Sequence, residues 1–338
     1  MNKESIQDRL KKHILILDGA MGTMIQAYKL EEEDFRGQRF KGHSESLKGN
    51  NDLLSITRPD VIEAIHRAYF EAGADIVETN TFSGTTIAQA DYACEDAVHD
   101  INFESARIAK KVANEFTKAQ PDKPRYVAGA IGPTNKTASI SPDVNNPGFR
   151  AISFDELYHA YKAQAKSLIE GGVDFLLVET VFDTLNAKAA LVAIDDLFQE
   201  GVKKVPISVS GTITDASGRT LSGQTPEAFL ISLMHIDLLS IGFNCALGAS
   251  QLLPYLQVLR RKAPFYISAY PNAGLPNEMG AYDESPEKMG EQVKTYLDLG
   301  LVNILGGCCG TQPEHIKVMA DLAKDAKPPK LNDENLEA

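Results

Sequence analysis

The stretch EGGVDFLLVETVF, residues 170–182, shows the pattern that decides the fold. Two glycines end a helix-like segment, a near-continuous apolar run follows, and the run closes on Glu179 and Thr180. Such a run is typical of a strand buried on both faces, as in a parallel sheet. The stretch EAGADIVETNTF, residues 71–82, repeats this order and also ends its run on Glu-Thr. The echo fits repeated strand-helix units, although it is not a separate proof of them.

Eight apolar runs of strand length recur along the chain, and a helix-like stretch follows each of them. In residues 153–172, for example, Ser153 and Glu156 have the spacing of a capping box. Eight alternations in 338 residues predict an α/β fold of the (β/α)8 TIM-barrel type. A doubly wound open sheet is the alternative, but no GxGxxG motif follows the first run. The runs are residues 13–19, 74–80, 125–133, 173–180, 206–211, 238–245, 265–272 and 302–309.

Two connections are long for a barrel, and both follow a predicted strand. Residues 28–58 come after the first run and residues 133–152 after the third. Long loops at the exit of barrel strands form lids and binding surfaces. The polar, proline-containing residues 327–338 have the composition of a tail or interdomain linker. We therefore expect residues 1–326 to form the barrel.

Composition excludes several classes of protein. Acidic residues outnumber basic ones 46 to 34, and the net charge of −12 argues against non-specific binding to nucleic acid or to an anionic membrane. The first dozen residues lack the apolar segment of a secretory signal, and no apolar run is long enough to span a membrane. Four cysteines in a chain of this length do not make a disulfide framework. A reducing, cytoplasmic location is expected.

Polar side chains and thiols stand at the ends of the predicted strands. In a barrel these ends meet at one mouth, which carries the active site. Strand ends are often polar simply because the chain leaves the core there. That reason explains the asparagine and aspartate residues well, but it explains the cysteines poorly. The strand-end residues are Asp18, Glu78, Asn80, Glu179, Asn244, Cys245, Asn272, Cys308 and Cys309.

Three of the four cysteines are strand-end residues. Cys245 ends the sixth run, and Cys308 and Cys309 end the eighth. Three converging thiolates suit Zn²⁺. A strained vicinal disulfide with a redox role and simple packing of small apolar side chains are the alternatives. Neighbours in a regular strand point to opposite faces, so we expect the glycines at 306, 307 and 310 to bend the chain.

Three protein ligands leave a fourth zinc position open, as in catalytic rather than structural sites. His315 is the one candidate to fill it, but the helix expected from residue 311 carries it away. An open zinc site with three thiolate ligands binds an incoming thiol as its thiolate, by lowering the pKa of that thiol. This predicts a reaction in which the sulfur of a thiol substrate is alkylated. Asp18 and Glu179 are placed to hold an ammonium group, and the backbone N–H groups of residues 18–24 a carboxylate. An amino-acid thiol is the substrate that these groups predict.

At these residues the chain resembles the homocysteine-binding domain of cobalamin-dependent methionine synthases, within the homocysteine S-methyltransferase family. The resemblance covers about residues 10 to 326. The pair GFNC and GGCCG is specific to the family in general, and residues 132–145 and 212–225 resemble the cobalamin-dependent branch. The motifs are ILDGAMGTMIQ (16–26), VETNTF (77–82), SGTITDASGRTLSGQT (210–225), GFNCALG (242–248), YPNAGLPN (270–277) and NILGGCCGTQPEHI (303–316).

The resemblance implies a (β/α)8 barrel in which Cys245, Cys308 and Cys309 ligate zinc and form the catalytic centre. Homocysteine binds the zinc through sulfur and takes a methyl group, which gives methionine.

It also implies the residues that bind the substrate. Asp18 and Gly19 match the family's substrate-binding turn, Glu179 matches the acid that meets the substrate amine, and Asn244 precedes the first ligand.

The donor that the resemblance implies is methylcobalamin, which a separate domain or subunit carries and methyltetrahydrofolate recharges. The expected partners are therefore cobalamin-carrying and folate-binding domains, because the family continues where this sequence stops. A stand-alone methyltransferase using S-methylmethionine or betaine is the alternative enzyme. A structural zinc protein without turnover is the alternative of another class.

Overall fold

The computed structural model describes residues 3–215 and 217–331, and it contains eight parallel strands that each overlap one predicted run. The hydrogen-bonded order is β1-β8-β7-β6-β5-β4-β3-β2, so every neighbouring pair except β1 and β8 is consecutive in the chain. This order confirms the barrel and excludes a doubly wound sheet. The strands are β1 (Leu15–Ile16), β2 (Ile76–Glu78), β3 (Tyr126–Ile131), β4 (Phe175–Val181), β5 (Ile207–Gly211), β6 (Ser240–Gly248), β7 (Tyr266–Asn272) and β8 (Ile304–Leu305).

The barrel closes between β1 and β2. An isolated parallel bridge pairs Leu17 with Ile76, just beyond the end of β1. The Asp75 N–H donates to the Ile16 carbonyl at 2.7 Å, and the Asp18 N–H donates to the Ile76 carbonyl at 3.0 Å. These bonds place the residues that follow β1 beside the end of β2.

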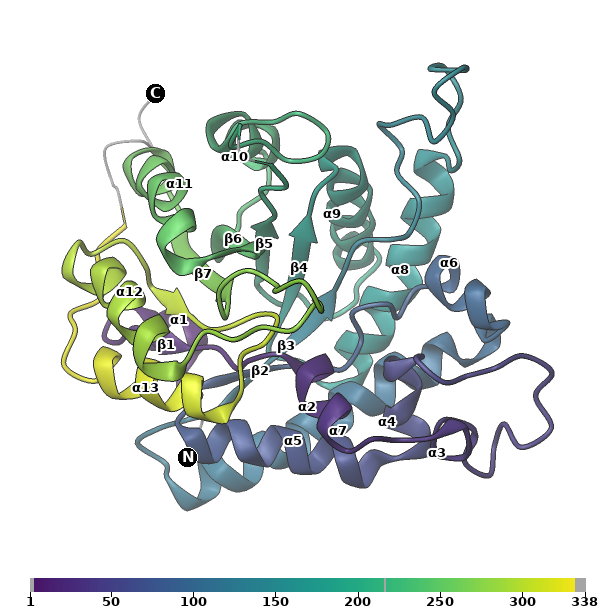
Figure 1. The fold of residues 1–338 in the computed structure, drawn as a ribbon, viewed down its shortest axis with the longest axis horizontal. Coiled ribbons are helices and arrows are strands. Elements are labelled where there is room, and N and C mark those ends of the chain that lie inside the picture. Colours follow the sequence, from purple (N-terminus) through teal and green to yellow (C-terminus); the bar gives the residue numbers. More distant parts are fainter. Residues whose placement is uncertain (1–2, 216, 332–338) are drawn as a thin grey trace.

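Eight long helices form a ring around the strands (Figure 1). Each packs on the next, and the last packs on the first, so the helix layer is also closed. The ring consists of α5 (Pro59–Ala72), α7 (Val98–Ala119), α8 (Phe154–Gly171), α9 (Thr184–Gln199), α10 (Pro226–Leu233), α11 (Ala249–Lys262), α12 (Pro286–Asp298) and α13 (Pro313–Ala323). Shorter elements are α1 (Ile6–Leu10), α2 (Met21–Ala27), α3 (Glu32–Arg36), α4 (Leu54–Thr57), α6 (Thr86–Gln89), η1 (Asn51–Leu53), η2 (Ala90–Tyr92) and η3 (Glu95–Ala97).

Helix α8 begins and ends as its sequence predicts. The Ser153 hydroxyl accepts from the Glu156 N–H at 3.2 Å, and the Glu156 carboxylate accepts from the Ser153 N–H at 2.9 Å. This capping box satisfies two N–H groups that would otherwise lack partners. The helix ends on Gly172, whose φ of +96° is open to glycine at little cost.

The core has two layers that the strands separate. In β4, Phe175 and Leu177 belong to the cluster inside the barrel, whereas Leu176 and Val178 pack with the helices. The alternation follows from the two-residue period of a strand, and it explains why the run is apolar throughout. Helix α1 adds two apolar side chains to the inner cluster.

The two long connections differ in structure. Residues 28–58 contain α3, η1 and α4, whereas residues 133–152 contain no helix or strand and extend away from the barrel (upper right in Figure 1). Both leave from the carboxyl ends of strands, which is the side where barrel enzymes carry their sites.

Of the predicted tail, residues 327–331 run along the barrel without regular structure, and the Pro329 carbonyl accepts from Asn303 Nδ2 at 2.7 Å. The rest of that prediction, residues 332–338, lies outside the described residues. None of the helices in the described part of the chain is long and apolar enough to cross a membrane.

Candidate functional site

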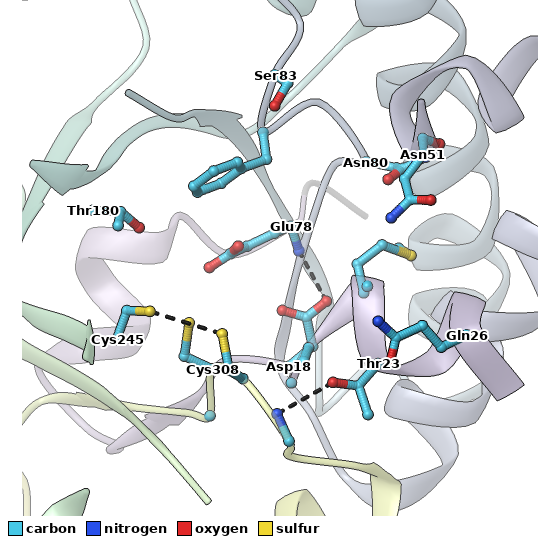
Figure 2. A pocket seen from close by; sticks show the side chains of 18 of the residues that line it. Asp18, Thr23, Gln26, Asn51, Glu78, Asn80, Ser83, Thr180, Cys245 and Cys308 are labelled. Carbon is cyan, nitrogen blue, oxygen red and sulfur yellow. Dashed lines mark hydrogen bonds between the residues drawn. The ribbon is translucent and has the colours of Figure 1, made fainter. Parts of the chain in front are cut away.

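A cavity of about 620 Å³ lies at the carboxyl ends of the strands (Figure 2). Its walls come from the loops after β1, β2, β7 and β8 and from the carboxyl-terminal parts of β4 and β6, so segments from the whole length of the chain meet there. Six of the seven predicted site residues line it, namely Asp18, Gly19, Glu179, Cys245, Cys308 and Cys309.

The three predicted thiols come together on one side of this cavity. The Sγ atoms of Cys245, Cys308 and Cys309 all lie within 4.8 Å of one another, and those of Cys245 and Cys309 are 3.8 Å apart. Within the described residues, no other group of three His, Cys, Asp or Glu side chains is close enough to hold a metal ion.

Cys308 and Cys309 reach the cavity from a turn beyond β8. Their expected position at the end of the eighth strand is wrong, because β8 stops at Leu305. The Cys308 N–H donates to the Pro271 carbonyl at 2.8 Å, and the Cys309 carbonyl accepts from the Ala273 N–H at 2.9 Å. Strand alternation therefore does not apply to this pair, and both thiols can face one point.

The glycines around the pair act differently from our expectation. Only Gly310 has a left-handed φ, +79°, whereas Gly306 and Gly307 do not. A Cβ on Gly307 would lie 2.4 Å from Thr311 Oγ1, and a Cβ on Gly306 would lie 2.7 Å from another side chain. Gly306 and Gly307 thus permit close packing, and Gly310 permits the turn.

Cys245 reaches the cavity through a bulge in β6. The pairing of β6 with β7 shifts register between Asn244 and Gly248, and Cys245 and Ala246 have φ of +59° and +54°. Such values are rare outside glycine and mark backbone held in place by its surroundings. The Thr212 hydroxyl donates to the Asn244 carbonyl at 3.0 Å and helps to fix the bulge.

Asn244, the seventh predicted site residue, is fully buried and does not line the cavity. Its Oδ1 accepts from the Thr180 N–H at 3.1 Å and from the Ser210 hydroxyl at 2.7 Å. Its Nδ2 donates to Thr180 Oγ1 at 2.8 Å and lies 4.0 Å from the Cys308 sulfur. These contacts support a role in positioning its neighbours, and direct substrate binding stays a prediction.

Three carboxyl groups stand opposite the thiols. Asp18 and Glu179 were predicted for this site, and Glu78 joins them from β2. The Glu78 N–H donates to Asp18 Oδ2 at 3.1 Å (dashed in Figure 2), and the side chains of Glu78 and Glu179 are close enough to shift each other's pKa. No lysine or arginine of the described residues pairs with them.

Burial dominates the electrostatics of these acids. It raises the pKa of Asp18, Glu78 and Glu179 well above their usual ranges, and the charge of a neighbouring carboxyl raises the pKa of each further, although the contact with Glu179 acts to lower that of Glu78. The sequence contained a signal for Glu78, because it and Glu179 hold the same place in the two repeated Glu-Thr strand ends.

The thiols influence one another in the same way. Hydrogen bonds from Cys245 and Cys308 lower the pKa of Cys309. The contacts with Cys245 and Cys309, followed by burial, raise the pKa of Cys308 well above its usual range. At such short distances the three thiols titrate together, because a negative charge on one of them disfavours ionisation of the others.

Two further cavity residues had no place in the sequence-based prediction. Asp52 belongs to η1 within the long connection 28–58, and its Oδ2 accepts from the Ser83 N–H at 2.6 Å. Burial raises the pKa of Asp52 to about 7. Tyr270 of β7 is 2% exposed, and its hydroxyl makes no hydrogen bond of ordinary geometry within the described residues, although the Ser210 side chain is close enough to act on its pKa.

The remaining thiol and the candidate fourth ligand lie elsewhere. His315 accepts from the Gln312 N–H through Nδ1 at 3.2 Å, and its Nε2 lies 2.9 Å from the Glu284 carbonyl oxygen. Cys94 is buried 3.9 Å from a ring nitrogen of His43. Neither belongs to the three-thiol group, and for His315 this is what the sequence predicted.

Solved structures with the same architecture include the homocysteine methyltransferase MmuM of Escherichia coli. Its metallated form is 21% identical, with a TM-score of 0.70 over 92% of this chain and 96% of that chain. Its oxidized form is 19% identical, with a TM-score of 0.71 over 94% and 98% of the two chains. At such identities the likeness establishes the fold.

A sequence comparison goes further than the fold. The family model described as homocysteine S-methyltransferase matches residues 15–323, which include the three thiols and the four carboxyl groups that line the cavity. The match spans most of the chain, and methyl transfer to homocysteine is the activity of the family that it describes. The chain therefore belongs to the homocysteine S-methyltransferase family.

Proposed function

We propose that this protein methylates the sulfur of homocysteine at a zinc ion held by Cys245, Cys308 and Cys309. The observation that carries the proposal is the meeting of three thiols and an acidic cluster in one cavity. The E. coli homocysteine methyltransferase of similar fold has a metallated form, which supports a metal here as well.

The thiol geometry fits zinc. Tetrahedral Zn–S bonds of about 2.3 Å set neighbouring sulfurs about 3.8 Å apart. The Cys245 and Cys309 sulfurs already have this separation, at 3.8 Å. Cys245, Cys308 and Cys309 would hold the zinc, and a zinc ion with three protein ligands would supply a fourth position that favours an incoming thiol as its thiolate.

The chain's own residues then orient the substrate. Asp18 and Glu179 accept from its ammonium group, which compensates their burial without a protein cation. Helix α2 begins at Met21 with no side-chain cap, so its first N–H groups are available to the substrate carboxylate. Gly19 lets the turn pack closely, because a Cβ there would lie 2.7 Å from the Thr311 hydroxyl. A sulfur lone pair would form the new S–CH3 bond while the donor's bond to that methyl breaks and its electron pair stays on the donor, and the thiol proton passes to solvent.

Two donors are candidates. Methylcobalamin on a cobalamin-carrying domain or subunit, recharged by a folate-binding one, follows from the resemblance of residues 132–145 and 212–225. In that case residues 327–338 act as a tail or linker outside a catalytic unit of residues 1–326. A stand-alone enzyme with a small donor, S-methylmethionine or betaine, has the stronger support from the comparisons, since this chain covers 96% of the metallated E. coli enzyme.

X-ray absorption at the zinc edge tests the metal proposal. Protein loaded with one zinc should show three sulfur neighbours, and homocysteine should add a fourth. A closed structural site would show four protein ligands before the thiol is added and no new sulfur afterwards, which would overturn the catalytic role.

The donor is tested by measuring methionine formation with free methylcobalamin, S-methylmethionine and betaine in parallel. Turnover with methylcobalamin alone assigns the cobalamin-dependent branch, and turnover with either small donor assigns the stand-alone alternative. Zinc-free protein is the control, because all three reactions require the same activated thiol.

A further inference from the structure

Thr180 has a backbone conformation that its residue type rarely adopts. It follows Glu179 in β4 and has a φ of +54°, at the point where β4 shifts register against β5. For a β-branched residue such a φ is a genuine outlier, and it persists only where the surroundings enforce it. Thr180 also lines the cavity, and Figure 2 shows it on the same side as Cys245.

The matching residue of the repeated strand end has ordinary backbone. Thr79 also ends a Val-Glu-Thr sequence, but its φ is not left-handed, and its N–H donates to the Ala128 carbonyl of β3 at 2.9 Å. The same three residues at a strand end therefore do not dictate the conformation of Thr180. Its cause has to come from a contact outside β4.

That contact is the side chain of Asn244, the residue before Cys245. Its Oδ1 accepts from the Thr180 N–H at 3.1 Å, and its Nδ2 donates to Thr180 Oγ1 at 2.8 Å. A backbone N–H can only donate, so the first bond fixes which end of the amide is the oxygen. The amide thus holds Thr180 by two bonds, although β5 lies between β4 and β6 in the sheet.

The paired bonds tie together two irregular strand ends. The pairing of β6 with β7 shifts register directly after Asn244, and Cys245 lies in the resulting bulge. The same Nδ2 group lies 4.0 Å from the Cys308 sulfur, so the amide also borders a second thiol. Asn244 is fully buried, and a lost acceptor for its Nδ2 group would not be replaced by solvent. Without Thr180 Oγ1, the amide would be free to turn and to release the bulge.

We propose that Thr180 is a positioning residue of the metal site: through Asn244 it holds Cys245 in place for zinc, without being a ligand itself. The inference rests on the proposed zinc site of three thiols. It adds a residue, on a different strand from all three cysteines, on which the geometry of that site depends.

The test is zinc affinity, measured by competition with a chromogenic chelator, in Thr180→Val and in the matched control Thr79→Val. Both changes replace a hydroxyl by a methyl group at the same place in the repeat. The Thr79 hydroxyl accepts from the Ala130 N–H at 3.0 Å, so its loss also leaves a buried donor without a partner.

The two variants should differ in zinc binding although both lose stability. Thr180→Val should bind zinc roughly 10-fold more weakly, as for the loss of an outer partner of a metal ligand, whereas Thr79→Val should stay within about twofold of the wild type. If Thr180→Val fails to fold, Thr180→Gly removes the same hydroxyl, tolerates the left-handed φ and should show the same loss of zinc affinity.

Two further variants separate positioning from a general loss of stability. Thr180→Ser keeps the hydroxyl, so it should restore zinc affinity to within about twofold of the wild type. The double variant Asn244→Ala/Thr180→Val should bind zinc no more weakly than Asn244→Ala alone, because Thr180 acts through that amide.

Wild-type zinc affinity in Thr180→Val, an equal loss in Thr79→Val, or additive losses in the double variant would overturn the inference. Failure of the proposed function itself looks different, since the wild-type protein would then hold no zinc at its three thiols.

Discussion

The two walls of the cavity differ in what must hold them together. The thiol wall stands on unusual backbone, with left-handed residues at Cys245 and Ala246 and a turn after β8. The acid wall also contains irregular backbone, since β4 shifts register between Val178 and Val181 and Thr180 has a φ of +54°, but its distinguishing feature is electrostatic, because carboxyls are buried there without a cation. The thiol wall therefore depends on packing that holds the chain in place, and the acid wall depends on a ligand that completes it.

This difference decides what each wall contributes. Strained backbone fixes the positions of ligand atoms before a metal arrives, which is how a protein sets coordination geometry. Uncompensated charge destabilises the empty protein, and that free energy is recovered when an ammonium group binds. Loss of a thiol should thus abolish metal binding, whereas loss of an acid should weaken substrate binding and stabilise the fold.

The largest effect is expected from Cys308→Ala. Removal of one of three ligands should lower zinc affinity by more than about 100-fold, since even outer partners of a metal are worth roughly 10- to 100-fold. Methionine formation should fall to background, while circular dichroism should show an intact barrel because the thiol lies at the mouth. Metal content by mass spectrometry of the purified variant is the measurement, and a full complement of zinc would refute the three-ligand assignment.

The second-largest effect is expected from Glu179→Gln, which changes the acid wall. Homocysteine binding should weaken roughly 10-fold or more through the loss of a charged hydrogen bond, with zinc content unchanged.

The same variant should be more stable than the wild type at neutral pH. The folded-state pKa of Glu179 is raised, so the folded protein binds more protons than the unfolded one, and its stability falls as pH rises past the unfolded pKa. Glutamine cannot ionise, so the variant does not lose this stability as the pH rises. Thermal melts of both proteins at acidic and neutral pH should show a difference that grows with pH, and a constant difference would contradict this account.

Gly307→Ala tests whether close packing, rather than dihedral freedom, shapes the thiol wall. Its Cβ would lie 2.4 Å from Thr311 Oγ1, so the turn must shift. We expect a loss of about 1–3 kcal/mol in the free energy of unfolding, as for overpacking, together with weaker zinc binding. Gly42→Ala is the matched control, because a Cβ there meets nothing within 4 Å. Equal denaturant midpoints for the two variants would show that the turn has room to spare.

The smallest effect is expected from Thr212→Val, a change of nearly constant shape. It removes the hydroxyl that donates to the Asn244 carbonyl beside the bulge. Stability should fall by about 1 kcal/mol, the usual value of a single hydrogen bond. Zinc affinity should fall several-fold if that bond holds Cys245 in place, and competition with a chromogenic chelator measures it. Unchanged affinity would show that the bulge is fixed by other contacts.

The sequence by itself determined the barrel and most of the cavity wall. Eight apolar runs with helix signals between them are local patterns, and each of them gave a strand. Because parallel strands of a barrel end at one mouth, the run ends alone were enough to bring Asp18, Glu179 and the three thiols to one cavity.

Only the tertiary structure decided how the groups in that cavity are presented. The bulge at Cys245 exists because residues of β5 and β7 constrain β6, and the turn at Cys308 exists because the backbone after β7 holds it. The surroundings of Glu78 were decided in the same way, because the repeat with Glu179 marks its strand end in the sequence but does not show that Asp18 and Glu179 lie beside it. Left-handed backbone and buried charge both arise from contacts between segments far apart in the chain, and no local pattern encodes them.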